Sequence, residues 1–89
     1  MITVSKEIIK ACADKGKEFF SEADIIDLVN ETKGEAKMKG DTVPTVLYHR
    51  QIESNTFENL VLCCLVANHM GISLRIDKFP PKEVVEGNL

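Results

Sequence analysis

The chain has 89 residues, of which 44% are hydrophobic and 28% are charged, a balance that is typical of one folded domain and excludes a disordered chain. Its longest uninterrupted apolar run, residues 60–67, is far shorter than the ~20 residues that cross a bilayer, so we expect no contact with a membrane. The net charge of −3 excludes a protein that coats nucleic acid by bulk attraction, so any nucleic-acid binding must come from a local patch.

The cysteines and the first residues of the chain indicate a compartment. Cys63 and Cys64 are neighbours and cannot pair with each other inside a helix, and an odd total of three cysteines does not make a disulfide framework. Residues 1–7 include polar and charged side chains where a signal peptide needs an apolar stretch. We therefore expect a cytoplasmic protein with reduced thiols.

Two helices are predicted in the first part of the chain. Ser5 is a suitable N-cap for the first helix, whose apolar residues recur at helical spacing until Gly16 ends it. Ser21 starts the second helix with a pattern similar to a capping box, and we expect this helix over residues 22–29. Residues 30–40 are polar, contain two glycines and have no periodic apolar face, so a long loop is predicted there.

A third helix is predicted to run to about Gln51, with Asp41 or Thr42 as its N-cap and Pro44 in its first turn, where proline is tolerated. A helical wheel divides this helix into two faces. The face expected to pack against the core carries Val43, Val46, Leu47 and the aliphatic part of Arg50. The face expected to be presented to a partner carries Thr42, Thr45, Tyr48 and His49.

A fourth helix is predicted over residues 57–70, because residues 54–56 offer N-caps and Gly71 has the features of a Schellman ending. Residues 72–77 alternate apolar and polar side chains, which indicates a short, half-buried strand. The alternative is that the apolar residues 60–67 form a strand paired with residues 72–77 in a hairpin, but the caps favour the helix.

Two consecutive prolines, Pro80 and Pro81, end regular structure close to the end of the sequence. We therefore expect one mainly α domain over residues 1–79 and a flexible tail over residues 80–89.

Three stretches of the sequence are similar to those of a known family. They are Ser-Glu-Ala-Asp-Ile-Ile at residues 21–26, Asn-Thr-Phe-Glu-Asn-Leu-Val-Leu at residues 55–62, and Asn-His-Met-Gly-Ile-Ser-Leu-Arg-Ile-Asp at residues 68–77. Together with Leu47 and Tyr48, they resemble a Cro/repressor-type helix-turn-helix domain, most closely the addiction-module antidote and prophage regulator group. The resemblance implies a four-helix, repressor-like domain that ends in a short strand and acts as a small transcriptional regulator or antidote-type protein of a phage or mobile element.

The same resemblance implies that the third helix enters the major groove of operator DNA, where residues near its N-terminus contact base edges. Hydroxyl, phenol and imidazole groups can bond to bases or phosphates, and lysines can neutralise phosphates. The candidate DNA-binding residues are Lys37, Lys39, Thr42, Thr45, Tyr48 and His49. Three features depart from the family: Glu22 replaces a common glutamine, Ile26 replaces a small residue, and the predicted turn before the third helix is longer than usual.

A second interpretation follows from the acidic balance. The same scaffold would be a protein-interaction module that binds and inhibits a partner such as a toxin, a polymerase or a defence nuclease. Glu22 and the long turn favour this interpretation, whereas Tyr48 and the pair Lys37 and Lys39 favour DNA. The simplest alternative to both is that the presented face of the third helix is an ordinary solvated surface.

The sequence shows no motif for catalysis, for a cofactor or for a metal. Zinc could be held by Cys12, Cys63, Cys64 and His69, but they lack the usual ligand spacing, and we expect the cysteines to be packed in the core. A cysteine nucleophile is also disfavoured, because Cys63 and Cys64 lie in an apolar run that would raise their pKa values.

A homodimer is predicted from the fourth helix. Its middle is apolar in every direction and must be covered on all sides, and three short helices offer too little surface to do so. We expect a second chain to complete the core, through helix four or through edge pairing of the strand. The candidate dimer-interface residues are Leu62, Val66, Ile72, Leu74 and Ile76.

Overall fold

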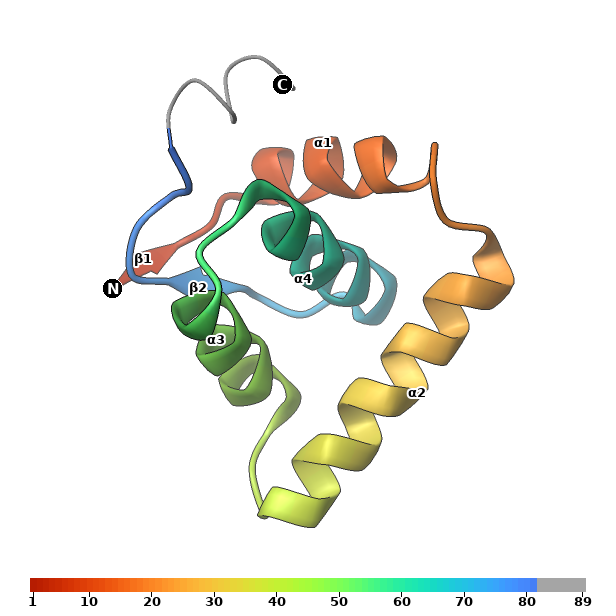
Figure 1. Cartoon of the computed structure of the whole chain (residues 1–89), viewed down its shortest axis with the longest axis vertical. Coiled ribbons are helices and arrows are strands. Elements are labelled where there is room, and N and C mark those ends of the chain that lie inside the picture. Colours follow the sequence, from red (N-terminus) through yellow and green to blue (C-terminus); the bar gives the residue numbers. More distant parts are fainter. Residues whose placement is uncertain (82–89) are drawn as a thin grey trace.

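The computed structural model describes residues 1–81 and is mainly helical. Its elements in chain order are β1 (Ile2–Thr3), α1 (Lys6–Gly16), α2 (Glu22–Lys39), α3 (Val43–Glu53), α4 (Phe57–Met70) and β2 (Arg75–Ile76). Figure 1 shows α4 in the middle of the molecule, with α1 across one end and with α2 and α3 meeting at a short turn at the other end. No helix in this part of the chain has the length and apolar character that a membrane span requires.

The predicted N-caps determine where the helices start. The hydroxyls of Ser5, Ser21, Thr42 and Thr56 each accept a hydrogen bond from the backbone N–H three residues later. At Ser21 the capping box is complete, because the Asp24 carboxylate accepts from the Ser21 N–H in return. The predicted boundaries of the fourth helix are confirmed, and so is its Schellman ending, in which the Ile72 N–H donates to the Ala67 carbonyl. The hairpin alternative is therefore wrong.

The prediction of a loop over residues 30–40 is wrong, because α2 continues without a break to Lys39. Thr32 and Ala36 extend the buried stripe that Ile25 and Val29 begin, at spacings of four, three and four residues. The sequence pattern missed this stripe because one of the two residues is polar and the other is small. Thr32 is compatible with the buried position because its hydroxyl donates to the Leu28 carbonyl one turn earlier, at 2.8 Å.

Only three residues, 40–42, connect α2 to α3, so the predicted long turn is also wrong. Gly40 has a φ of 69°, a left-handed conformation that glycine adopts without strain. The Asp41 N–H donates to the Ala36 carbonyl and the Gly40 N–H to the Lys37 carbonyl, which together form a Schellman ending. The connection is therefore a tight turn.

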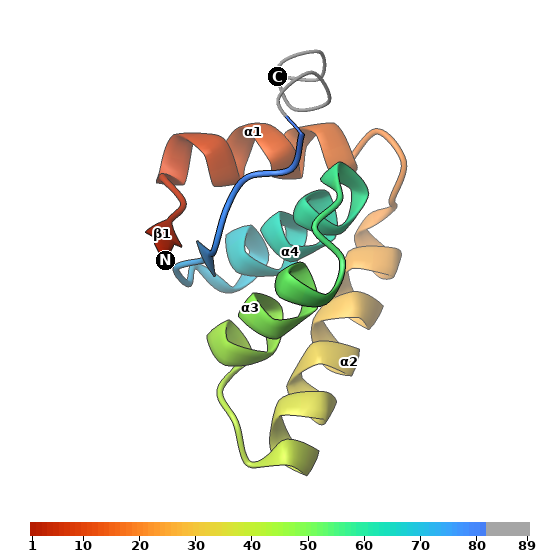
Figure 2. The same ribbon diagram turned by 60° about the vertical axis from the view of Figure 1, so that its left-hand side comes forward.

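The predicted strand over residues 72–77 is reduced to Arg75–Ile76, and its partner is β1, which was not predicted. The two strands are antiparallel, with Ile2 opposite Ile76 and Thr3 opposite Arg75. Just beyond this pair, the Val4 N–H donates to the Leu74 carbonyl at 2.8 Å. The start of the described chain is thus joined to the segment after α4 (Figure 2).

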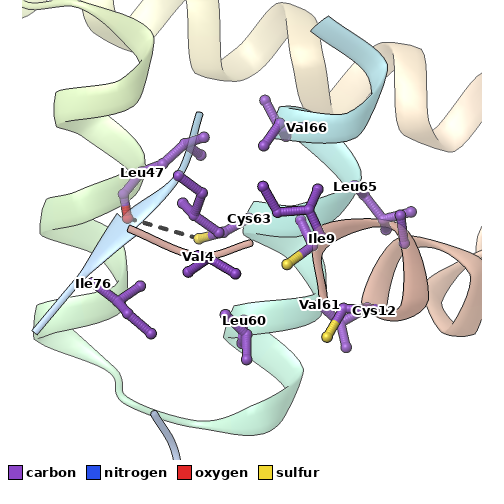
Figure 3. Packing of buried hydrophobic residues seen from close by; sticks show 14 of the residues in the cluster. Val4, Ile9, Cys12, Leu47, Leu60, Val61, Cys63, Leu65, Val66 and Ile76 are labelled. Atoms are coloured by element: carbon purple, nitrogen blue, oxygen red, sulfur yellow. Dashed lines mark hydrogen bonds between the residues drawn. The ribbon is translucent and has the colours of Figure 1, made fainter. Parts of the chain in front are cut away.

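The core is built around α4, whose buried side chains face every direction around the helix axis. Figure 3 shows Leu47 of α3 and Ile76 of β2 approaching α4 from one side, and Ile9 and Cys12 of α1 from the other. The helices α1 and α4 approach each other closely at Gly16, where an added Cβ would lie 2.8 Å from side-chain carbons of both Val61 and Leu65. One chain therefore covers its own central helix, and the premise of the dimer prediction is wrong.

The predicted boundary between domain and tail is only partly covered by the structure. Pro80, which we assigned to the tail, is buried. Residues 82–89 lie outside the described residues.

Candidate nucleic-acid interface

The candidate interface is the exposed side of α3 together with the end of α2 that precedes it. The tight turn at residues 40–42 has the length and the glycine that are common in helix-turn-helix motifs. Figures 1 and 2 agree that this turn lies at the end of the molecule away from α1. The start of α3 is therefore presented at an extremity of the fold.

A hydrogen-bonded network fixes α3 against α2. The Arg50 guanidinium donates to the Thr32 hydroxyl at 2.8 Å and to the Glu35 carboxylate at 3.3 Å. Thr32 is fully buried, so its hydroxyl needs these two partners, the Leu28 carbonyl and Arg50. The expected packing face of α3 is thus confirmed: Val46 and Leu47 are buried, and Arg50 is directed towards α2.

The opposite end of Arg50, its backbone carbonyl, joins α3 to α4. It accepts a hydrogen bond from the Asn59 side chain at 2.7 Å. The same Asn59 amide also donates to the Ser54 carbonyl at 2.9 Å, which holds the connection between the two helices. The direction of α3 is therefore set by bonds to both of its neighbours.

The two threonines at the start of the presented face are already hydrogen-bonded. The Thr42 hydroxyl accepts from the Thr45 N–H at 3.3 Å, as an N-cap does. The same hydroxyl lies 3.0 Å from the Thr45 hydroxyl, within hydrogen-bonding distance. Thr42 is exposed and Thr45 is half-buried, so Thr45 can still offer its methyl group and remaining hydroxyl capacity to a ligand.

Tyr48 differs most from what the wheel implies. Its phenol donates a hydrogen bond to the carboxylate of Asp77, just after β2. This bond raises the pKa of the Tyr48 phenol, because the proton it holds is shared with a carboxylate. Tyr48 therefore connects α3 to the segment after β2. Its neighbour His49 is exposed, and the centroids of the Tyr48 and His49 rings are 5.9 Å apart.

Lys37 and Lys39 are exposed in the last turn of α2, next to the tight turn. Lys39 lies 3.6 Å from the Glu35 carboxylate, one helical turn earlier. Exposed ion pairs of this kind are weak, so Lys39 can exchange Glu35 for a phosphate at little cost. Both lysines thus lie at the end of a helix and not in the predicted loop, and their contact with phosphates stays a prediction.

Arg75 is a candidate residue that the sequence analysis did not assign to the site. It lies in β2 and lines a small hollow beside α3 together with Met1, Pro44, Thr45 and Tyr48. Its side chain is exposed, and within the described chain it takes part in no ion pair. The alternation of residues 72–77 marks Arg75 as exposed, but only the β1–β2 pairing places it beside α3.

The residues predicted for a dimer interface lie in two different environments. Val66, Leu74 and Ile76 are fully buried within one chain and are unavailable to a second one, so this part of the predicted interface is wrong. Leu62 and Ile72 are partly exposed. A pair of copies stays a prediction only for a palindromic operator, where two recognition helices would read the two half-sites.

No model of a protein family, no curated protein and no solved structure matches the chain. The resemblance to Cro/repressor-type domains therefore stays a prediction from residues 21–26, 55–62 and 68–77.

Proposed function

We propose that the protein binds double-stranded DNA through α3 and acts as a small transcriptional regulator or antidote-type helix-turn-helix protein. The observation that carries this proposal is the three-residue turn at residues 40–42, which leads directly into the presented face of α3. A long flexible loop would not hold a recognition helix in a fixed orientation, and the structure has none at this point. The bonds from Arg50 to α2 and from Asn59 to α3 add to that rigidity.

The distribution of charge along α2 supports the same proposal. The first part of the helix carries the acids Glu22, Asp24, Asp27 and Glu31. The last part carries Lys33, Lys37 and Lys39 and one acid, Glu35. The excess of negative charge is thus concentrated away from the tight turn. Lys37 and Lys39 next to the turn and Arg75 beside α3 would supply the positive charge that phosphate contacts require.

The structure also refines which side chains carry the proposed contacts. Tyr48 is committed to Asp77, so we assign base contacts to Thr45 and His49. Lys37, Lys39 and Arg75 would contact phosphates, because their cationic ends are exposed on both sides of α3.

The test begins with selection of binding sites from a random double-stranded oligonucleotide library, followed by fluorescence anisotropy with the selected site. We expect the combined Thr45→Ala and His49→Ala variant to lose the preference for that site and to keep the folded circular dichroism spectrum. We expect Lys37→Ala with Lys39→Ala to weaken binding to all sequences and to reduce the salt slope by about 2.

The matched control is Lys6→Ala with Lys10→Ala, which removes the same charge from the exposed side of α1. This control should leave the salt slope close to that of the wild type. A wild-type protein that selects no sequence from the library would contradict the proposal, and so would equal effects of the two lysine pairs.

A further inference from the structure

An apolar groove lies between α1, the α1–α2 connection, α2 and α4, and no residue of α3 lines it. It consists of two adjoining hollows of about 390 and 340 Å³, which share Phe19, Phe20 and Leu62. Phe57 of α4 extends the first hollow, and Leu28 of α2 extends the second. Phe19 is 75% exposed, which is unusual for a phenyl group that could have been folded into the core.

The rim of this groove is acidic. Asp24, Asp27 and Glu31 of α2 line one hollow, and Glu58 of α4 lines the other. Asp24 is used by the capping box, but the other three carboxylates take part in no ion pair among the described residues. Among residues 1–81, the one cation in the lining is Lys15, whose ammonium lies 3.4 Å from the Glu18 carboxylate.

This combination of shape and charge distinguishes between possible occupants. A second copy of the chain, docked symmetrically, would place the same carboxylates against each other as water is excluded. A partner with lysine or arginine beside its apolar residues would instead pair with Asp27, Glu31 and Glu58. Because the β1–β2 sheet contributes nothing to the groove, the partner would not bind by adding a strand.

We propose that this groove binds a basic, amphipathic helix of a partner protein. Two successive apolar side chains on one face of that helix enter the two hollows on either side of Phe19, and its cationic side chains pair with the acidic rim. The groove and α3 are formed by different residues. The protein can therefore hold a protein partner and DNA at the same time, as a regulator controlled by a partner would.

The proposal is tested with the full chain and a synthetic, fluorescently labelled peptide of about 18 residues, in which leucine recurs at helical spacing and lysine fills the polar face. Two control peptides replace every lysine with glutamate, or keep the composition in alternating order. We expect saturable binding of the first peptide only, with a Kd on the order of 10–100 µM. Amide shifts of ¹⁵N-labelled protein should be largest around Phe19, Phe20 and Leu62.

Two variants locate the binding site. Phe19→Ser removes an exposed phenyl group and should weaken peptide binding about tenfold, whereas Met38→Ser, at an 89% exposed apolar side chain elsewhere on α2, should not. Glu31→Lys should weaken binding and its salt dependence, whereas Glu7→Lys, with the same change of charge on α1, should leave both unchanged.

Three outcomes would overturn the proposal. One is equal binding of the glutamate peptide, which would show that the acidic rim has no role. Another is binding that Phe19→Ser leaves unchanged. The third is a wild-type dimer that Phe19→Ser dissociates, which would assign the groove to a second copy of the chain.

Discussion

Tyr48 shows why position on a helical wheel does not determine what a side chain is free to do. The wheel places it on the presented face of α3 beside Thr45 and His49, and all three could be expected to contact DNA. The partner of Tyr48 is Asp77, 29 residues later in the chain, which no local pattern connects to it. Thr42 and Thr45 are different, because their mutual bonds are those of an N-cap and follow from the sequence.

Cys63 has a similar long-range partner, and it leads to a prediction about pH. Its thiol donates to the Leu47 carbonyl at 3.7 Å. Burial raises the pKa of this thiol to about 11, although the positive charge of Arg50 lowers it by a smaller amount. The folded pKa thus lies above the ordinary value of 9.0. The contribution of the protonated Cys63 thiol to the free energy of unfolding is therefore complete below pH 9 and is lost as the pH rises towards 11.

We expect the free energy of unfolding to fall by about 1 kcal/mol between pH 8 and pH 10 through Cys63 alone. Urea unfolding at the two pH values measures this fall. A hydrogen bond with Cys12, together with burial, raises the pKa of Cys64 as well, so part of the fall should remain in Cys63→Ala. An identical fall in the wild type and in Cys63→Ala would contradict the prediction.

The sequence predicted the parts of the helices that hydrogen bonds between near neighbours in the chain determine, and missed the part that is determined by burial against other helices. Ser5, Ser21 and Thr56 mark helix starts because a hydroxyl replaces missing backbone acceptors, and the Schellman ending at Gly71 is equally local. The second half of α2 is different. The buried Thr32 hydroxyl donates to the Leu28 carbonyl of its own helix and also accepts from Arg50 of another helix, which no local pattern reveals. Strand β1 is likewise recognisable only beside β2.

The extent of α2 can be tested with Gly34, inside the helix, and Gly40, directly after it, which we expect to respond in opposite directions. Gly34 is inside the helix with no atom within 4 Å of an added Cβ, so Gly34→Ala should stabilise the protein by about 0.5–1 kcal/mol. Gly40 has equal space but a φ of 69°, so Gly40→Ala should destabilise it by roughly 1 kcal/mol.

Urea unfolding of the two variants and the wild type measures these changes. The two variants can be compared directly, because the substitutions are chemically identical and both sites are exposed. If residues 30–40 were a mobile loop, neither alanine would change the stability much. Destabilisation by Gly34→Ala would therefore contradict the helical assignment.

The rest of the molecule covers its most apolar helix, α4. The sequence predicted correctly that α4 needs cover on all sides, because its middle is apolar in every direction. It underestimated the cover available within one chain: α2 has 18 residues, and Val4, Leu74 and Ile76 add apolar side chains from outside the helices. The prediction considered only helices as cover for α4, and it assigned α2 less than half of its length.

The free protein is therefore expected to be monomeric. Val66, Leu74 and Ile76 have no exposed surface left to bury against a second chain, and symmetric docking at Leu62 would bring the acidic groove rims together. Sedimentation equilibrium at tens of micromolar should give the mass of one chain, 9.9 kDa. On a palindromic site, two copies would then bind independently, and the occupancy of each half-site would follow a hyperbolic curve without cooperativity. A stable dimer without DNA would contradict this expectation, and its loss in Ile72→Glu but not in Phe19→Ser would place the interface beside β2, away from the groove.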